Sequence, residues 1–431
     1  MQSMRRGIGI GIVIGALVLT GCSAGGQAGG EVDASLDPAE VGGELSYAIW
    51  DVNQEAGMKA LIEDFNKTYP NVEVSVEVTA FAQYFTKLQT QGSSGTLPDV
   101  FWMNGPNFQL FASNDMLAPI APLEDAGMVD PANYPEAMNE LYSLDGEMYG
   151  IPKDFDTIAV YYNREILEKA GLEEPTSDWT WDDYRSMAKQ ISDKLGGEGI
   201  IGAGENYDIQ PMVYPAILGN GGYIIKDGKS GYDDPKTIEA LQFWADMVAD
   251  GAMLTPAQNA DTSGTQRFLN GQAGMVWSGT WQVGPLLDSV VKDKVGVVEL
   301  PLAPSGDRQS VIHGIGNVMS AKAADDPAAQ AFLAYLGTEE AALIQADMGI
   351  ANPAFNDTQQ AFVDSAPDYS LDIFLTAGTD YSKPYPISKN TGAWNKFETE
   401  LLPEAFSGDR PVEEVAKDLA DRMNQALAKE D

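Results

Sequence analysis

Strand-like and helix-like patterns alternate along the chain from residue 44 onward. Residues 44–50 (ELSYAIW) are typical of a strand, and apolar residues at helical spacing predict a helix over 58–69. Residues 72–78 (VEVSVEV) alternate strictly between apolar and polar, which indicates a half-buried strand, and 81–103 predict another helix and strand. This order predicts an α/β fold in which mainly parallel sheets are covered by helices on both faces.

Signals for the starts of helices recur later in the chain. Thr180 is a predicted N-cap, with Asp183 three residues on as in a capping box. The pairs 234–235 and 326–327 are both Asp-Pro, which places a cap residue before a proline at the first helical position. Apolar residues recur at helical spacing over 412–423, so we expect the chain to end in a helix.

The amino terminus predicts export and lipidation. Two arginines at 5–6 precede an apolar run at 8–20, which suits a signal peptide and is too short to span a membrane. The run ends in LTGC, which resembles the bacterial lipobox, whose cysteine is lipidated. We therefore predict a signal peptide over 1–21, removed before Cys22. A Gly-, Ala- and acid-rich lipidated tether over 22–43 then holds the protein on the outer side of the cell membrane.

Charge and composition narrow the function classes. The chain has 26 Lys and Arg against 64 Asp and Glu, a net charge of −38, with no basic stripe, which excludes nucleic acid as a partner. The negative field also disfavours an anionic ligand. A single Cys and a single His leave no disulfide and no zinc-type spacing, so we predict neither a metal nor a cofactor.

Five segments resemble the solute-binding proteins of ABC-type sugar importers, the family that contains maltodextrin-binding protein. They occur in the family's order over about 370 residues: FNKTYPNVEVSVEV with its continuation to LPDVFWMN, GEMYGIPKDFDTIAVYYNREILEKAG, GQAGMVWSGTWQVGPL, AAQAFLAYLGTEEAALIQADMGIANPAF and GAWNKFETELLPEAFSG. The resemblance implies an extracytoplasmic lipoprotein that captures a neutral oligosaccharide and delivers it to the transmembrane subunits of a permease. We expect a monomer.

The resemblance also implies how the chain is divided. The family has a type II periplasmic-binding-protein-like fold, in which two α/β lobes are joined by three crossings and close around the ligand. Carried over, lobe 1 comprises 44–155 together with 310–338, and lobe 2 comprises 156–309 together with 339–431. The expected binding site is the cleft between the lobes.

A neutral sugar needs flat aromatic side chains for its C–H face and polar side chains for its hydroxyl groups. Trp281, after Gly279 and Thr280, stands where the family places a stacking tryptophan, and Trp394 matches a late aromatic position of the family. Trp50, Asp51 and Trp102 follow or end predicted strands, where ligands of α/β sheets tend to lie. The other predicted ligand-binding residues are Tyr84, Asn104, Asp154, Asp156, Tyr207, Asn220, Trp277, His313 and Gly314.

Other functions stay open at this point. The same fold could bind a polyamine, a polyol or a peptide, and the acid-rich composition makes a cationic ligand conceivable. A secreted glycoside hydrolase needs two carboxylates across the sugar, and close acidic pairs arise by chance in so acidic a chain. The sequence contains no nucleotide-binding loop and no nucleophile elbow. We therefore predict a binding protein and not an enzyme.

Overall fold

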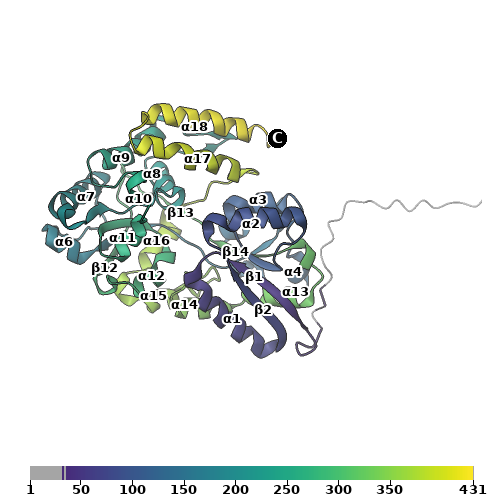
Figure 1. The fold of residues 1–431 in the computed structure, drawn as a ribbon. Helices are drawn as coiled ribbons and strands as arrows, with labels where there is room; N and C mark the ends of the chain where they lie inside the picture. The colour runs from purple at the N-terminus through teal and green to yellow at the C-terminus, as the bar shows by residue number, and fades with distance from the viewer. Residues whose placement is uncertain (1–31, 34, 431) are drawn as a thin grey trace, which may run out of the picture.

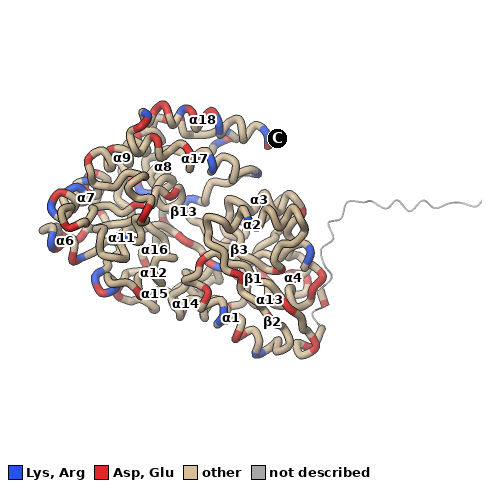
Figure 2. The backbone as a smooth tube through the Cα atoms, viewed as in Figure 1, with Lys and Arg blue, Asp and Glu red and all other residues tan. Residues whose placement is uncertain are grey.

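The computed structural model describes residues 32–33 and 35–430. The predicted signal peptide and the predicted lipidation site at Cys22 lie outside this range. Within it, no helix combines the length and the apolar character needed to cross a membrane. Asp and Glu residues are spread along the whole described backbone (Figure 2).

The first half is built on a five-stranded sheet with the order β2-β1-β3-β14-β6. β1 pairs in parallel with β2 and β3, whereas β14 pairs antiparallel with β3 and β6. The strands are β1 (Gly42–Ile49), β2 (Asn71–Val78), β3 (Val100–Asn104), β6 (Gly150–Pro152) and β14 (Ile315–Met319). The helices packed in this half are α1 (Glu55–Thr68), α2 (Phe81–Ser94), α3 (Gly105–Ala112), α4 (Ala121–Asp125), α5 (Glu136–Leu141) and α13 (Pro327–Leu336).

The second half is built on a four-stranded sheet with the order β12-β7-β11-β8. Its strands are β7 (Ala159–Asn163), β8 (Ile201–Ala203), β11 (Ala273–Ser278) and β12 (Val295–Val298). Both faces of this sheet are covered, because alternate residues of β7 enter different apolar clusters: Val160 and Tyr162 enter one, and Ala159 and Tyr161 the other.

Helices α17 and α18 form a layer at the outer side of the second half (Figure 1). The helices of this half are α6 (Arg164–Ala170), α7 (Trp181–Leu195), α8 (Tyr214–Gly219), α9 (Pro235–Ala249), α10 (Pro256–Asn259), α11 (Gly264–Leu269), α12 (Val283–Leu287), α15 (Gln359–Ser365), α16 (Asp372–Asp380), α17 (Thr391–Phe406) and α18 (Val412–Leu427). Short ladders are β4 (Ser143–Leu144) with β5 (Glu147–Met148), β9 (Ile225–Lys226) with β10 (Lys229–Ser230), and β13 (Ser310–Ile312) with β15 (Ser382–Pro384).

The α/β fold is confirmed, but the prediction of mainly parallel sheets is wrong in its detail. Both sheets are mixed: β14 runs antiparallel to its neighbours in the first, and β7 runs antiparallel to β11 and β12 in the second. The cause is long-range connectivity. β14 enters the first sheet from a distant segment and not through a strand-helix-strand crossover, which is what produces parallel neighbours.

The predicted helix caps are confirmed. Thr180 and Asp183 form both hydrogen bonds of the capping box at the start of α7. Asp234 and Asp326 cap α9 and α13 ahead of their prolines. The predicted tether extends too far, because Val41 is already buried in the first core and β1 begins at Gly42.

The chain passes between the two halves at three places. It leaves the first sheet after β6 and enters the second at β7, and it returns between β13 and β14. α14 (Glu339–Asp347) lies between the halves: Ala341 belongs to the first core and Ala346 to a cluster of the second. Ala354 still belongs to the first core and Phe362 to the second. The third passage therefore lies between 354 and 362.

Candidate functional site

Aromatic side chains gather where the strands of the first sheet end. The ring of Trp50, just after β1, makes edge-on contacts with Trp102 on β3 at 5.1 Å and with Tyr84 on α2 at 5.2 Å between centroids. Trp102 is fully buried and its Nε1–H donates to the Tyr47 hydroxyl at 2.7 Å. The Tyr84 hydroxyl is equally buried and lies 3.0 Å from the carbonyls of Ala48 and Trp102. Of the three predicted site aromatics here, Trp50 alone is partly exposed.

A buried ion pair lies beside this aromatic group. Lys153, just after β6, donates to Asp154 Oδ2 at 2.7 Å and to Gln54 Oε1 at 3.0 Å. Its ammonium nitrogen is 4.9 Å from the centre of the Trp102 ring. Gln54 in turn donates to Asp51 Oδ2 at 3.3 Å, so a polar chain joins the end of β1 to the first passage between the halves. Sequence reasoning predicted Asp51 and Asp154 but missed Lys153 and Gln54.

Asp156 joins the first passage to the second sheet. The hydroxyl of Thr280, in the short helix that follows β11, donates to Asp156 Oδ1. Burial, together with the nearby charge of Asp154, raises the pKa of Asp156 to about 8. The next residue, Trp281, is partly exposed, and its ring lies against Gly279, where an added Cβ would come within 2.1 Å of the ring.

His313 and Gly314 lie at the second passage. The backbone of His313 pairs with that of Asp156, and its ring is 5.1 Å from that of Tyr385. Burial lowers the pKa of His313 to about 4, so the imidazole is neutral at pH 7. Gly314 has a packing reason to be glycine, because an added Cβ would lie 2.0 Å from the carbonyl oxygen of Asp154.

Three predicted site residues make contacts inside the second half. Trp277 on β11 is buried and packs edge-on against Trp244 at 4.9 Å. The Asn220 amide donates to the Lys236 carbonyl and to Glu239, each at 2.9 Å. The Tyr207 hydroxyl donates to the carbonyl of Leu254. Each of the three residues therefore has a packing or hydrogen-bond partner within the second half.

Two further predicted residues lie where α3 and α17 meet. Asn104 caps α3 by accepting from the backbone N–H of Asn107 at 3.2 Å. Trp394 on α17 is fully buried, and its Nε1–H donates to the Ser388 hydroxyl at 2.8 Å. α17 contacts α3 directly, so helices from the two halves lie side by side here.

A buried carboxylate on α17 was not predicted. Glu398 accepts hydrogen bonds from Tyr214 at 3.0 Å, from Asn395 at 2.6 Å and from Tyr232. Burial raises its pKa to about 7, against the hydrogen bonds that favour the charged form. Tyr385 links this group to His313, since its ring lies 5.2 Å from that of Tyr214. Nothing in the local sequence around Glu398 distinguishes it from exposed helix acids.

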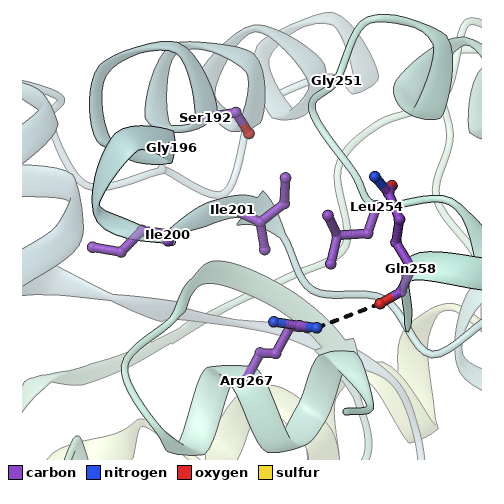
Figure 3. A pocket seen from close by; sticks show the side chains of 9 residues that line it. Ser192, Gly196, Ile200, Ile201, Gly251, Leu254, Gln258 and Arg267 are labelled. Carbon is purple, nitrogen blue, oxygen red and sulfur yellow. Dashed lines mark hydrogen bonds between the residues drawn. The ribbon is translucent and has the colours of Figure 1, made fainter. Parts of the chain in front are cut away.

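A separate pocket of about 380 Å³ lies at the start of β8 (Figure 3). Ile200, Ile201 and Leu254 supply apolar walls, and Arg267 reaches toward the Gln258 carbonyl across one side. None of the predicted site residues lines it. It lies at the amino end of β8, whereas the predicted residues Trp277 and Trp281 lie near the carboxyl end of the parallel strand β11.

In the part of the chain that the structure describes, no group of three or more His, Cys, Asp or Glu side chains is placed to hold a metal ion.

A family model described as "Bacterial extracellular solute-binding protein" matches residues 50–343. An arabinooligosaccharide-binding protein of Bacillus subtilis is 27% identical over 337 residues, which cover 75% of this chain and 74% of that protein. Its namesake from Halalkalibacterium halodurans is 26% identical and covers 84% of this chain and 86% of its own.

Solved structures share the architecture. An ABC substrate-binding protein from Listeria monocytogenes, in complex with cycloalternan, superposes with a TM-score of 0.82 at 25% identity, over 89% of this chain and 99% of that chain. A maltose-bound protein from T. maritima gives a TM-score of 0.78 at 21% identity, over 89% and 99% of the two chains. The second likeness shows the fold alone.

Proposed function

This chain belongs to the bacterial extracellular solute-binding proteins, and we propose that it captures a neutral oligosaccharide between its two halves for delivery to the permease of an ABC importer. The proposal includes the two lobes predicted from the sequence, with the third crossing moved to between 354 and 362. It also includes a monomeric state and a site that holds the sugar without transforming it.

One observation carries the proposal: the Asp156–Thr280 hydrogen bond joins two segments that each carry predicted sugar contacts. On one side are Asp154 and the aromatic group around Trp50 and Trp102; on the other is Trp281, which is partly exposed. Aromatic faces beside buried carboxylates suit a ligand with C–H faces and hydroxyl groups. The relatives named above as arabinooligosaccharide-binding proteins support this ligand class.

Calorimetry with a panel of arabino-, galacto- and malto-oligosaccharides tests the proposal. We expect at least one to bind, and we expect Trp281→Ala to weaken that binding about tenfold or more while the protein stays folded, since a stacked aromatic contributes on the order of 1.5 kcal/mol. Trp244→Phe, deep in the second core, is the control for general effects on packing. Unchanged affinity in Trp281→Ala would remove this residue from the site.

Adding polyamines, polyols and peptides to the panel separates the alternatives. Binding of a polyamine, a polyol or a peptide in place of any oligosaccharide would keep the family and change the ligand. New reducing ends after incubation with the bound oligosaccharide would reveal a glycoside hydrolase. The family consists of binding proteins, which favours an unchanged sugar.

We also propose that Cys22 carries the lipid anchor. The support is the lipobox-like LTGC after a signal-type apolar run. Expression in a bacterial host should give a membrane-associated protein of lipidated mass, and Cys22→Ala should release it to the soluble fraction. A wild-type protein that is soluble and carries no lipid would contradict this assignment.

A further inference from the structure

Large apolar side chains are exposed together at one edge of the first sheet. Phe81, the first residue of α2, is 56% exposed, Val52 just after β1 is 64% exposed, and Val78 at the end of β2 is 37% exposed. β1 and β2 are parallel, so these residues lie at the edge where both strands end, which is also the edge of Trp50 and Asp51. Exposed apolar side chains that lie together in this way mark an interaction site.

The exposed ring continues the aromatic group of the site outward. Trp102 is fully buried, Trp50 is partly exposed, and Phe81 is exposed. Trp50 contacts Trp102 at 5.1 Å on one side and Phe81 at 5.7 Å on the other. Phe85 also contacts Phe81 edge-on, with ring centroids 6.0 Å apart. Phe81 is therefore held in place by packed rings and presents the rest of its surface to solvent.

The surroundings favour a neutral sugar ring as the occupant. On β2, Glu77 is ion-paired with Lys87 at 3.1 Å. After β1, the Asp51 carboxylate accepts hydrogen bonds from the side-chain amides of Asn53 and Gln54. Asn53 and Gln83, from the segments that carry Val52 and Phe81, are exposed amides that suit hydroxyl groups. A flat apolar surface flanked by amides matches a pyranose or furanose ring with its C–H face down.

We infer that Phe81 forms an outer stacking subsite, which holds a sugar ring of the ligand beyond the rings enclosed near Trp281 and Asp156. This rests on the proposed function and adds to it: the ligand is an oligosaccharide long enough to leave the inner site and reach the rim of the first half. Phe81 then determines preference for chain length, and the inner site determines which sugar is bound.

The test measures affinity against ligand length. Calorimetry uses the purified protein with a homologous series of the oligosaccharide that the panel identifies, from the disaccharide upward. For the wild type we expect affinity to rise at the length that reaches Phe81. Phe81→Ala should remove that rise, a loss of about three- to tenfold for longer members, and leave the disaccharide unchanged.

Two matched variants separate the effect of a flat ring that stacks on a sugar from the effect of an apolar side chain without a ring. Phe81→Trp keeps a flat ring and should retain the length dependence, whereas Phe81→Leu is apolar without a flat face and should behave like Phe81→Ala. Val290→Ala, at another exposed apolar position that is 73% exposed, is the control and should change nothing. Urea unfolding of each variant checks that the fold is intact.

The outcomes distinguish the two proposals. A wild type that binds no oligosaccharide refutes the proposed function and this inference together. A wild type that binds, with Phe81→Ala unchanged at every length or weakened equally at every length, refutes the outer subsite alone. Loss confined to the longer members, with Phe81→Trp preserved, supports it.

Discussion

Replacing Lys153 with Met tests the buried ion pair that joins the end of β1 to the first passage between the halves. The Lys153 side chain is 0% exposed and that of Asp154 is 2% exposed, and their charged atoms are 2.7 Å apart. Met has a similar length and fills much of the same space, so the perturbation removes a charge and leaves the cavity small. Asp154 then keeps its hydrogen bond from the Ile315 N–H at 2.7 Å but loses its counter-charge.

The size of the stability loss follows from the charge of Asp154, which stays buried in the variant. Removing one partner of a buried pair costs about 3–5 kcal/mol, because the other charge is left uncompensated. The variant also loses the hydrogen bond to Gln54 and the contact of the ammonium group with the Trp102 ring, while the burial of Met offsets part of the loss. We expect Lys153→Met to lower the free energy of unfolding by about 3 kcal/mol.

Urea unfolding followed by tryptophan fluorescence measures this change. Asp154→Asn is the complementary single variant, and the double variant carries neither charge. Since the double variant leaves no unpaired charge, we expect it to be more stable than Lys153→Met by about 2 kcal/mol. The coupling between the two sites is the loss in the double variant minus the sum of the two single losses. A loss under about 1 kcal/mol in Lys153→Met, or strictly additive losses, would refute the reasoning that the pair is buried and mutually compensated.

Three further predictions concern pH, packing and a helix cap. Because the pKa of Glu398 is raised to about 7, its folded state binds more protons than the unfolded state between about pH 4.5 and 7, so its contribution to stability falls as pH rises through that window. In urea unfolding, the free energy of unfolding of Glu398→Gln should therefore fall by about 2 kcal/mol less than that of the wild type when the pH is raised from 5.5 to 8. Equal decreases in the two proteins would contradict this. Gly314→Ala should destabilise by at least about 2 kcal/mol, because the Asp154 carbonyl oxygen stands 2.0 Å from the new Cβ, whereas Gly197→Ala, with nothing within 4 Å of its new Cβ, is the control and should cost little. Thr180→Ala should lower thermal stability by about 1 kcal/mol through loss of the capping box, and no change would show that the cap is replaced by water.

Short-range patterns determined the elements of this protein. The alternation over 72–78 and the cap at Thr180 act within a few residues, so their outcome in β2 and α7 could be predicted without the fold. The alternation of strand and helix patterns likewise predicted the α/β class, and the end of the first predicted strand pointed to Trp50. The family-like segments directed attention to Asp156 and Trp281, whose segments are joined in the structure by the hydrogen bond between Asp156 and Thr280.

Only the tertiary structure decided which of these side chains are buried and with what partner. Trp277 and Trp281 are four residues apart, yet the first packs on Trp244 in the core and the second stays partly exposed. In the sequence Lys153 is an ordinary charged residue, but in the fold it is buried and donates a hydrogen bond to Gln54, 99 residues away in the chain. The antiparallel pairing of β14 arises in the same way, from contacts over hundreds of residues. Periodicity describes a segment's own neighbours, whereas burial and charge pairing depend on segments that only the folded chain brings together.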